Sequence, residues 1–244
     1  MNTTKLGIKF LETNNYEELS RKCAEVMIEC LKNKPNALFC IATGESPNLC
    51  YEIFVQRVKE EKIDVSKLRL IKLDEWFGIR MDDPATCETF IKRKLLEPLN
   101  IPMENYYGFN SNADKEEEEC KRISDKLKEE GPIDLCILGL GKNGHLGLNE
   151  PGSYLIPHSH TTEIDSKTKT HSMLNKTNVN VSKGITLGIV DIISSKQILF
   201  IVSGEEKKEV FNEFLEVKIK TSLPASLLWL HYNTLCIFEK SMIF

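Results

Sequence analysis

Apolar positions along the chain fall into two patterns, one of three- and four-residue spacing and one of short continuous runs. Between Leu19 and Leu31 the apolar residues recur at helical spacing, which predicts a helix with one buried face. Residues 33–36 interrupt that pattern, and 37–42 form an apolar run typical of a buried strand. The same reasoning predicts the remaining elements, which are strands at 68–73, 133–140, 185–190, 197–202 and 233–239 and helices at 46–58, 113–130 and 205–215.

The alternation of strands with helices predicts a single α/β domain over 1–244. It indicates a doubly wound, mostly parallel sheet with helices on both faces. No repeat period and no low-complexity linker interrupts the chain, and the stretch 141–182 is irregular. In such sheets ligands gather outside the carboxyl ends of the strands, so the functional residues are expected there.

Composition narrows the class of partner. The net charge is −4, with acids and bases mixed along the chain, whereas non-specific binding to nucleic acid or to an anionic membrane needs a basic face. No window approaches the roughly 20 apolar residues of a spanning helix, and the N-terminal stretch has no apolar core like that of a secretion signal. The eight cysteines are dispersed, with no Cys-x-x-Cys pair, as is typical of reduced, buried thiols. We therefore expect a cytoplasmic protein with a small-molecule ligand.

Two predicted strand-to-helix turns suit an anion. In 43–47, Ser46 suits an N-cap and Pro47 the first helical turn, so free N–H groups are expected at a helix N-terminus. The second turn, 202–207, puts Lys207 at the start of a helix. Alone, the first turn is typical of an ordinary capped helix and the lysine of a solvated side chain, but two such turns in one sheet favour a phosphate group. The predicted phosphate-binding residues are Thr43, Gly44, Glu45, Ser46 and Lys207.

Two further strand ends carry candidates for proton transfer. Asp74 ends an apolar strand, where a carboxylate acts as a general base once partly desolvated, or merely caps the following turn. Residues 138–152 form a glycine-rich loop that presents Asn143, His145 and Glu150 together. Histidine is the side chain best suited to proton transfer near neutral pH, and a nearby carboxylate can orient it.

Other readings of the histidines and glycines are less favoured. The loop contains a literal G-x-G-x-x-G, but a dinucleotide fingerprint must open a long helix, and Asn-Glu-Pro-Gly at 149–152 cuts any helix short. His158 and His160 have no carboxylate or cysteine at metal-ligand spacing, which favours solvated loop residues over zinc ligands. His231 is expected to be packed or to line the site. There is no G-x-S-x-G nucleophile elbow.

These motifs together resemble the glucosamine-6-phosphate isomerase/deaminase and 6-phosphogluconolactonase superfamily over nearly the whole chain. The residues that carry the resemblance are 42–47, 73–76 and 139–151, and Asn-Glu-Pro at 149–151 is similar to the deaminase branch. Within that branch the chain is most similar to the bacterial galactosamine-6-phosphate deaminase/isomerases, through 72–76, 86–90, 142–148 and 224–231.

The resemblance implies a reaction without metal or cofactor. His145 would help to open the sugar ring, and Asp74 would move a proton from C2 to C1. Ammonia would leave from C2, so that galactosamine 6-phosphate gives tagatose 6-phosphate. Glu150 would orient His145 and tune its charge, with Asn143 beside them, while the two turns and Gly144 would contact the substrate.

The chain also departs from this family's pattern. Asn143 stands where glucosamine-type members have an aspartate, and Met173 where they have a phosphate-site arginine, which would leave Lys207 more nearly the sole cationic clamp. The chain ends soon after the last predicted strand, and His160 and Thr162 stand at loop positions where allosterically regulated members have basic residues. We therefore expect no activation by N-acetylglucosamine 6-phosphate.

Three alternatives stay open at the level of sequence. The substrate could be glucosamine 6-phosphate instead of galactosamine 6-phosphate, because no motif specifies a contact with the C4 hydroxyl. A 6-phosphogluconolactonase would use the same fold and release no ammonia. A sugar-phosphate sensor is a non-enzymatic reading, but such sensors normally carry a basic DNA-binding segment. Neither a homo-oligomer nor a monomer is specified, since members of the resembled family range widely in assembly.

Overall fold

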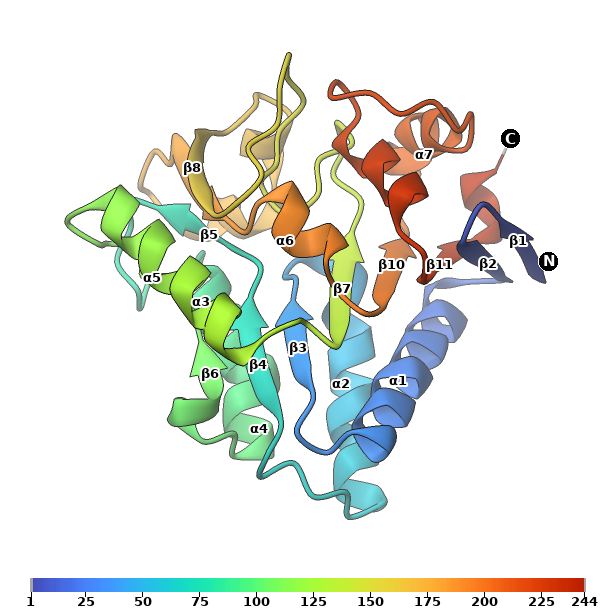
Figure 1. Cartoon of the computed structure of the whole chain (residues 1–244), viewed down its shortest axis with the longest axis horizontal. Helices are drawn as coiled ribbons and strands as arrows, with labels where there is room; N and C mark the ends of the chain where they lie inside the picture. Colours follow the sequence, from blue (N-terminus) through green and yellow to red (C-terminus); the bar gives the residue numbers. More distant parts are fainter. Residues whose placement is uncertain (1, 244) are drawn as a thin grey trace.

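The continuous apolar runs form the strands of one eight-stranded sheet in the computed structural model, which describes residues 2–243 (Figure 1). The strand order is β1-β2-β11-β10-β7-β3-β4-β6, and every neighbouring pair is parallel except β1 with β2. The mostly parallel α/β prediction is therefore confirmed. The strands are β1 (Asn2–Lys5), β2 (Ile8–Thr13), β3 (Leu38–Ile41), β4 (Arg69–Lys72), β6 (Tyr106–Tyr107), β7 (Leu135–Gly139), β10 (Ile198–Val202) and β11 (Thr234–Glu239).

Helices cover both faces of this sheet, because side chains of the strands alternate between two separate cores. In β3, Phe39 and Ile41 join one core and Leu38 and Cys40 join the other. The first core takes α1 (Tyr16–Asn33), α2 (Glu45–Glu60), α3 (Cys87–Ile91), a π-helical turn (Lys92–Leu96) and α4 (Glu97–Leu99). The second takes α5 (Glu116–Glu130), α6 (Ile189–Ile193) and α7 (Lys208–Phe214).

Short 3-10 turns supply much of the remaining structure. They are Met103–Asn105, Thr168–Thr170, Ser172–Lys176, Glu205–Lys207, Pro224–Leu230 and Lys240–Met242. The helix predicted at 205–215 is thus a 3-10 turn followed by α7, and the helix predicted at 113–130 begins three residues later, at Glu116.

A small antiparallel sheet, β5-β9-β8, was not predicted. It consists of β5 (Asp74–Phe77), β9 (Lys183–Thr186) and β8 (His160–Glu163). Figure 1 shows the arrowheads of β3, β4 and β7 pointing toward the end of the molecule that carries β5 and β8. The added sheet therefore lies at the carboxyl ends of the main strands.

Three sequence predictions are corrected here. Asp74 does not end a strand but begins β5, because the main strand stops at Lys72. The strand predicted at 185–190 is β9 followed by α6, since the Gly188 N–H donates to the Asp191 carboxylate and so caps a helical turn. The N-cap of α2 is Gly44, at φ +100°, and not Ser46, which lies within the helix.

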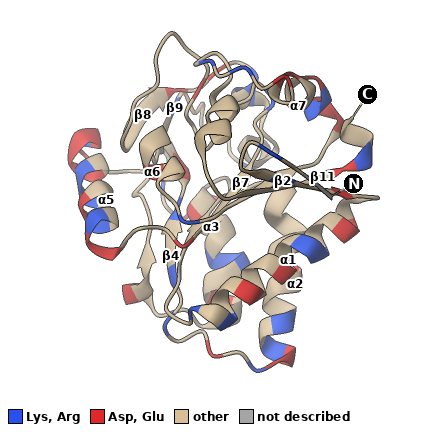
Figure 2. Cartoon of the chain, turned by 45° about the vertical axis from the view of Figure 1, so that its right-hand side comes forward, with Lys and Arg blue, Asp and Glu red and all other residues tan. Residues whose placement is uncertain are grey.

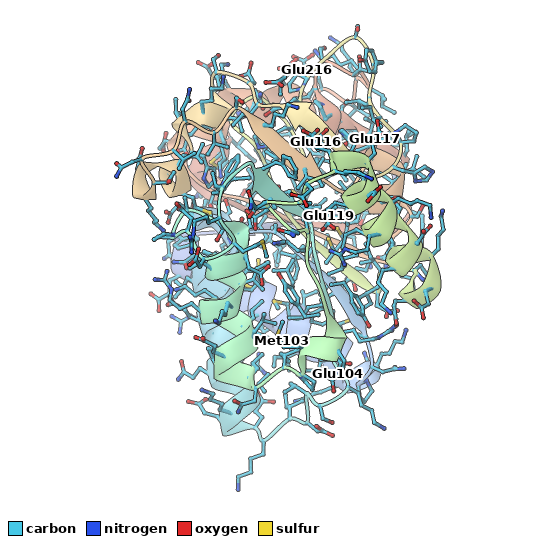
Figure 3. All side chains as sticks on the ribbon, turned by 90° about the vertical axis from the view of Figure 1, so that its left-hand side faces the viewer. Met103, Glu104, Glu116, Glu117, Glu119 and Glu216 are labelled. Atoms are coloured by element: carbon cyan, nitrogen blue, oxygen red, sulfur yellow. The ribbon has the colours of Figure 1, made fainter. Side chains whose placement is uncertain are left out.

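The distribution of charge agrees with the mixed pattern in the sequence. Figure 2 shows Lys and Arg interleaved with Asp and Glu along α1, α2 and α5. The first turn of α5 carries four glutamates, three of which are labelled in Figure 3. All eight cysteines are free thiols, and all but Cys30 are buried. No helix within 2–243 has both the length and the apolar character that crossing a bilayer requires.

Candidate active site

A cavity of about 230 Å³ opens where the predicted strand ends meet the small sheet. Its walls come from segments far apart in the sequence, at 42–46, 73–76, 139–148, 167–175 and 206–207. Seven of the ten predicted site residues line it, and these are Thr43, Gly44, Glu45, Ser46, Asp74, His145 and Lys207. Asn143, Gly144 and Glu150 lie behind the wall.

Asp74 lies in the cavity wall at the junction between the two sheets. Its strand pairs with β9, in register with Thr186, and the Leu187 N–H donates to the carbonyl of the preceding residue, Leu73. Burial and the neighbouring carboxylate of Glu75 raise the pKa of Asp74 to about 7, although His145 and Lys72 oppose the shift. A carboxyl with such a pKa is able both to accept and to return a proton near neutral pH.

An ion cluster around the fully buried side chains of Lys72 and Glu75 supports β5 next to Asp74. The ammonium of Lys72 lies 2.7 Å from Glu75 Oε2 and 2.8 Å from Glu88 Oε2. Glu75 also accepts backbone N–H groups of the chain at 76, 87 and 88, and the Tyr106 hydroxyl donates to Glu88 at 2.7 Å. With two carboxylates and one ammonium, the cluster carries one negative charge close to Asp74.

Glycines shape the loop that carries His145. Gly144 adopts φ +87°, and a Cβ there would lie 2.3 Å from Leu223 Cδ1, so this position requires glycine. The imidazole of His145 packs directly against Gly141, where a Cβ would come within 2.4 Å of its ring. The loop closes tightly through the Gly141 N–H, which donates to the His145 carbonyl at 3.1 Å.

The contacts of His145 leave one ring nitrogen for a ligand. Its Nδ1 lies 3.1 Å from Thr168 Oγ1 and 3.4 Å from Glu150 Oε2. No partner within 2–243 occupies Nε2, and the residue lines the cavity. Nε2 is therefore the atom available for proton transfer.

Asn143 reaches Glu150 and the main chain of His145, not its ring. Its Nδ2 donates to Glu150 Oε2 at 2.7 Å, and its Oδ1 accepts the His145 N–H at 3.2 Å. Burial alone would raise the pKa of Glu150, but hydrogen bonds from His145, Thr168 and Asn143 outweigh it and hold that pKa below its usual value. Glu150 is thus an ionised acceptor behind the imidazole.

The two predicted anion turns meet in space. Lys207 Nζ donates to Ser46 Oγ at 2.8 Å, and the Ser203 hydroxyl lies 3.3 Å from the same oxygen. Gly44 caps α2 and lines the cavity, so the unpaired backbone N–H groups of the first turn of α2 lie at the cavity wall. Burial lowers the pKa of Lys207. A cation, hydroxyls and a helix N-terminus therefore converge, as an oxyanion of a phosphate requires.

Sequence reasoning missed several residues of the cavity. Lys142 and Lys167 line it, so Lys207 is not the only cation there, and Met173 is buried in the first core instead of facing the cavity. His171, two residues before Met173, does line the cavity wall. Burial together with the cations around it lowers the pKa of His171 to about 4. Lys142 lies in the motif already singled out, whereas 167–175 has no periodicity that could have drawn attention to it.

The other histidines lie apart from this site. His158 Nδ1 lies 2.8 Å from the Asp191 carboxylate, and His160 Nδ1 contacts the His158 carbonyl. His231 is buried between the Thr234 hydroxyl and the Ser195 carbonyl and does not line the cavity, so it is packed. In the part of the chain that the structure describes, no group of three or more His, Cys, Asp or Glu residues could hold a metal ion.

The chain is similar to known proteins over most of its length. The family model "Glucosamine-6-phosphate isomerases/6-phosphogluconolactonase" matches residues 12–236. The chain is 41% identical over 228 residues to "Putative deaminase AgaI" of Escherichia coli (strain K12), covering 93% of this chain and 90% of that protein. It is 34% identical to the glucosamine-6-phosphate deaminase of Thermoanaerobacter sp. (strain X514) over 235 residues, 96% of this chain and 93% of that enzyme.

Solved structures show the same fold. A structure described as a monomeric glucosamine-6-phosphate deaminase of the NagB superfamily superposes with a TM-score of 0.89 at 30% identity, covering 96% of this chain and 98% of that one. The 6-phosphogluconolactonase from Plasmodium vivax superposes with a TM-score of 0.77 at 20% identity, covering 97% and 91%. The second likeness concerns the fold alone.

Proposed function

Because this chain belongs to the glucosamine-6-phosphate isomerase/6-phosphogluconolactonase family, we propose that it is an amino-sugar-phosphate deaminase that also isomerises its substrate. It converts galactosamine 6-phosphate into tagatose 6-phosphate and ammonia. The observation that carries the proposal is that Asp74 and His145 line one cavity together with Lys207 and the turn at 43–46. Two proton-transfer groups and an anion site are what the reaction needs.

The first step opens the sugar ring at His145. Its Nε2 accepts the proton of the anomeric hydroxyl and delivers it to the ring oxygen. The C1–O5 bond breaks, its electron pair stays on that oxygen, and C1 becomes an aldehyde carbon. Glu150, an ionised acceptor behind the imidazole, stabilises the imidazolium that exists between the two transfers.

The second step moves a proton along the open chain. The carboxylate of Asp74 removes the C2 proton while the substrate's own ammonium group gives a proton to O1, which forms an enolamine. The Asp74 carboxyl then protonates C1. The resulting imine at C2 takes up water and releases ammonia, which leaves the ketose. The pKa of Asp74, raised by burial to about 7, suits a group that must act as base and then as acid.

The phosphate group fixes the sugar in the cavity. Lys207, the Ser46 hydroxyl and the N–H groups at the start of α2 would bind its oxygens, and Lys142 adds a second cation in the same wall. Thr43, Gly44 and Glu45 complete that turn, while Gly144 gives the loop its shape. No cofactor takes part in these steps.

Ammonia release tests this function directly. The purified protein is given galactosamine 6-phosphate and glucosamine 6-phosphate in parallel, with no added cofactor. Faster release from the galacto sugar is the expected result, and faster release from the gluco sugar would overturn the substrate assignment but keep the chemistry. If neither sugar released ammonia, the deaminase proposal would be wrong. Hydrolysis of 6-phosphogluconolactone or binding without turnover would then identify the lactonase or the sensor.

A further inference from the structure

Thr168 brings a buried hydroxyl to the back of His145. Its Oγ1 lies 3.1 Å from Nδ1 of the imidazole, closer than the Glu150 carboxylate oxygen at 3.4 Å. The residue is only 3% exposed and begins a 3-10 turn in a segment that lines the cavity. A buried hydroxyl at this distance is a hydrogen-bonding partner of the ring.

The same segment is tied to Glu150, which fixes where this hydroxyl lies. The Asp165 N–H donates to Glu150 Oε1 at 3.3 Å, and the Asp165 carbonyl accepts the Lys169 N–H at 2.9 Å. Glu150 also accepts from Asn143, and Thr168 is among the side chains that stabilise its ionised form. The hydroxyl therefore lies among a carboxylate that can only accept and an imidazole nitrogen.

The ionised state of Glu150 favours one direction for these hydrogen bonds. An ionised carboxylate has no proton to give, and a hydrogen bond from the Thr168 side chain is among the causes that hold the pKa of Glu150 low, so we assign the hydroxyl proton of Thr168 to Glu150. The hydroxyl oxygen is then an acceptor for His145, and Nδ1 must carry a proton to satisfy it. Nε2 is left with its lone pair facing the cavity.

We propose that Thr168 is a positioning residue that holds His145 in its Nδ1–H tautomer, so that Nε2 is a proton acceptor at the start of each turnover. The catalytic consequence rests on the proposed function, because only a reaction that begins with proton removal by His145 needs this tautomer. The tautomer itself follows from the contacts of the ligand-free protein and is tested without any substrate.

Three variants separate this role from general packing. T168V keeps the side-chain shape and removes the hydroxyl, whereas T168S keeps the hydroxyl. T177V is the matched control, because Thr177 lies on the same part of the chain and its hydroxyl donates to Asp83 at 2.9 Å, outside the cavity wall.

Nitrogen-15 NMR of histidine-labelled protein reads the tautomer in the ligand-free state, with H145Q identifying the His145 signals. We expect the Nδ1–H form in the wild type, T168S and T177V, and a mixture of tautomers in T168V. An Nε2–H form in the wild type would overturn the proposal even if T168V failed to fold. An unchanged Nδ1–H form in T168V would overturn it as well.

Kinetics provide the second readout. T168V should lower kcat about tenfold, the effect of one lost hydrogen bond, while KM stays within about twofold and T168S and T177V stay near wild type. Wild-type kcat in T168V would contradict the proposal. Absence of ammonia release from the wild-type protein would instead refute the proposed function, and the NMR result would still decide the role of Thr168.

Discussion

The carboxyl of Asp74 has a protonation equilibrium that links activity to stability. In the folded protein burial raises its pKa to about 7, whereas an unfolded aspartate titrates near its ordinary value, about 3.9. Between these values the folded state binds the proton more tightly. Stability contributed by this group is therefore fully present below pH 4 and is lost as pH rises through 7.

Replacing that carboxyl with an amide should remove this loss. We expect Asp74→Asn to match the wild type near pH 4 and to be more stable by about 2–4 kcal/mol at pH 8. Urea unfolding at both pH values measures the difference. Asp82→Asn is the control, because Asp82 is exposed and pairs with Arg80, and it should show no gain. A stability difference that did not change with pH would contradict the assigned pKa.

Lys207 should contribute mainly to binding. Lys207→Ala should raise KM for the amino-sugar phosphate about tenfold to a hundredfold, with a smaller effect on kcat, because a charged hydrogen bond to the phosphate is lost. Lys218→Ala, at an exposed pair with Glu216, provides the comparison. An unchanged KM in Lys207→Ala would mean that the phosphate binds elsewhere.

Single residues were predictable from the sequence where they sat in a recognisable motif. Asp74, His145 and Lys207 each follow or adjoin a strand, so their convergence followed from the expected sheet. Thr168 and His171 lie in a stretch without periodicity, where neither local pattern nor spacing indicates what a side chain contacts. Long-range packing, which a sequence window does not contain, brings them to the cavity.

Among the structural elements, the strand β4 and the start of β5 depend on a buried charge. Lys72→Met should destabilise the protein by about 3–5 kcal/mol, because it leaves the fully buried carboxylate of Glu75 and the partly buried carboxylate of Glu88 without their cation. Denaturant unfolding measures this loss. Lys32→Met, which breaks an exposed pair with Glu61, should cost no more than about 1 kcal/mol. Equal losses in the two variants would contradict the account of the buried cluster.

The loop that carries His145 should be intolerant of a side chain at Gly144. Gly144→Ala faces both an unfavourable φ and a contact with Leu223, so we expect a loss of about 2–4 kcal/mol and a clear fall in kcat. Gly78→Ala has a similar φ of +90° but open space around it, so it should cost about 1 kcal/mol and leave kcat unchanged. Full activity in Gly144→Ala would show that the loop shape does not matter.

Central elements could be predicted and peripheral ones could not. Strands β3, β4, β7, β10 and β11 were expected within a few residues, because strands buried on both faces read as continuous apolar runs. The edge strand β1, its neighbour β2 and the small sheet carry mixed polar residues, so their pattern resembles a loop. At 185–190 the glycine at 188 and its carboxylate cap outweighed the strand propensity of the isoleucines.

On the scale of the whole molecule, the arrangement of the two sheets explains the position of the site. The main strands end together at one edge of the sheet, and the small sheet closes over that edge with Asp74 in its first strand. Alternation of elements was enough to predict the class and this edge. It could not predict the closing sheet, which depends on pairing between residues more than a hundred positions apart.

The central claim is that Asp74 moves a proton between C2 and C1 of an amino-sugar phosphate in this cavity. The most direct test follows the C2 proton of galactosamine 6-phosphate by NMR in heavy water, with wild-type protein and with Asp74→Asn. We predict rapid loss of the C2 signal with the wild type and loss at least about a hundredfold slower with the variant, although calorimetry shows the sugar phosphate still bound. Loss of the C2 proton at the wild-type rate in Asp74→Asn would contradict the claim.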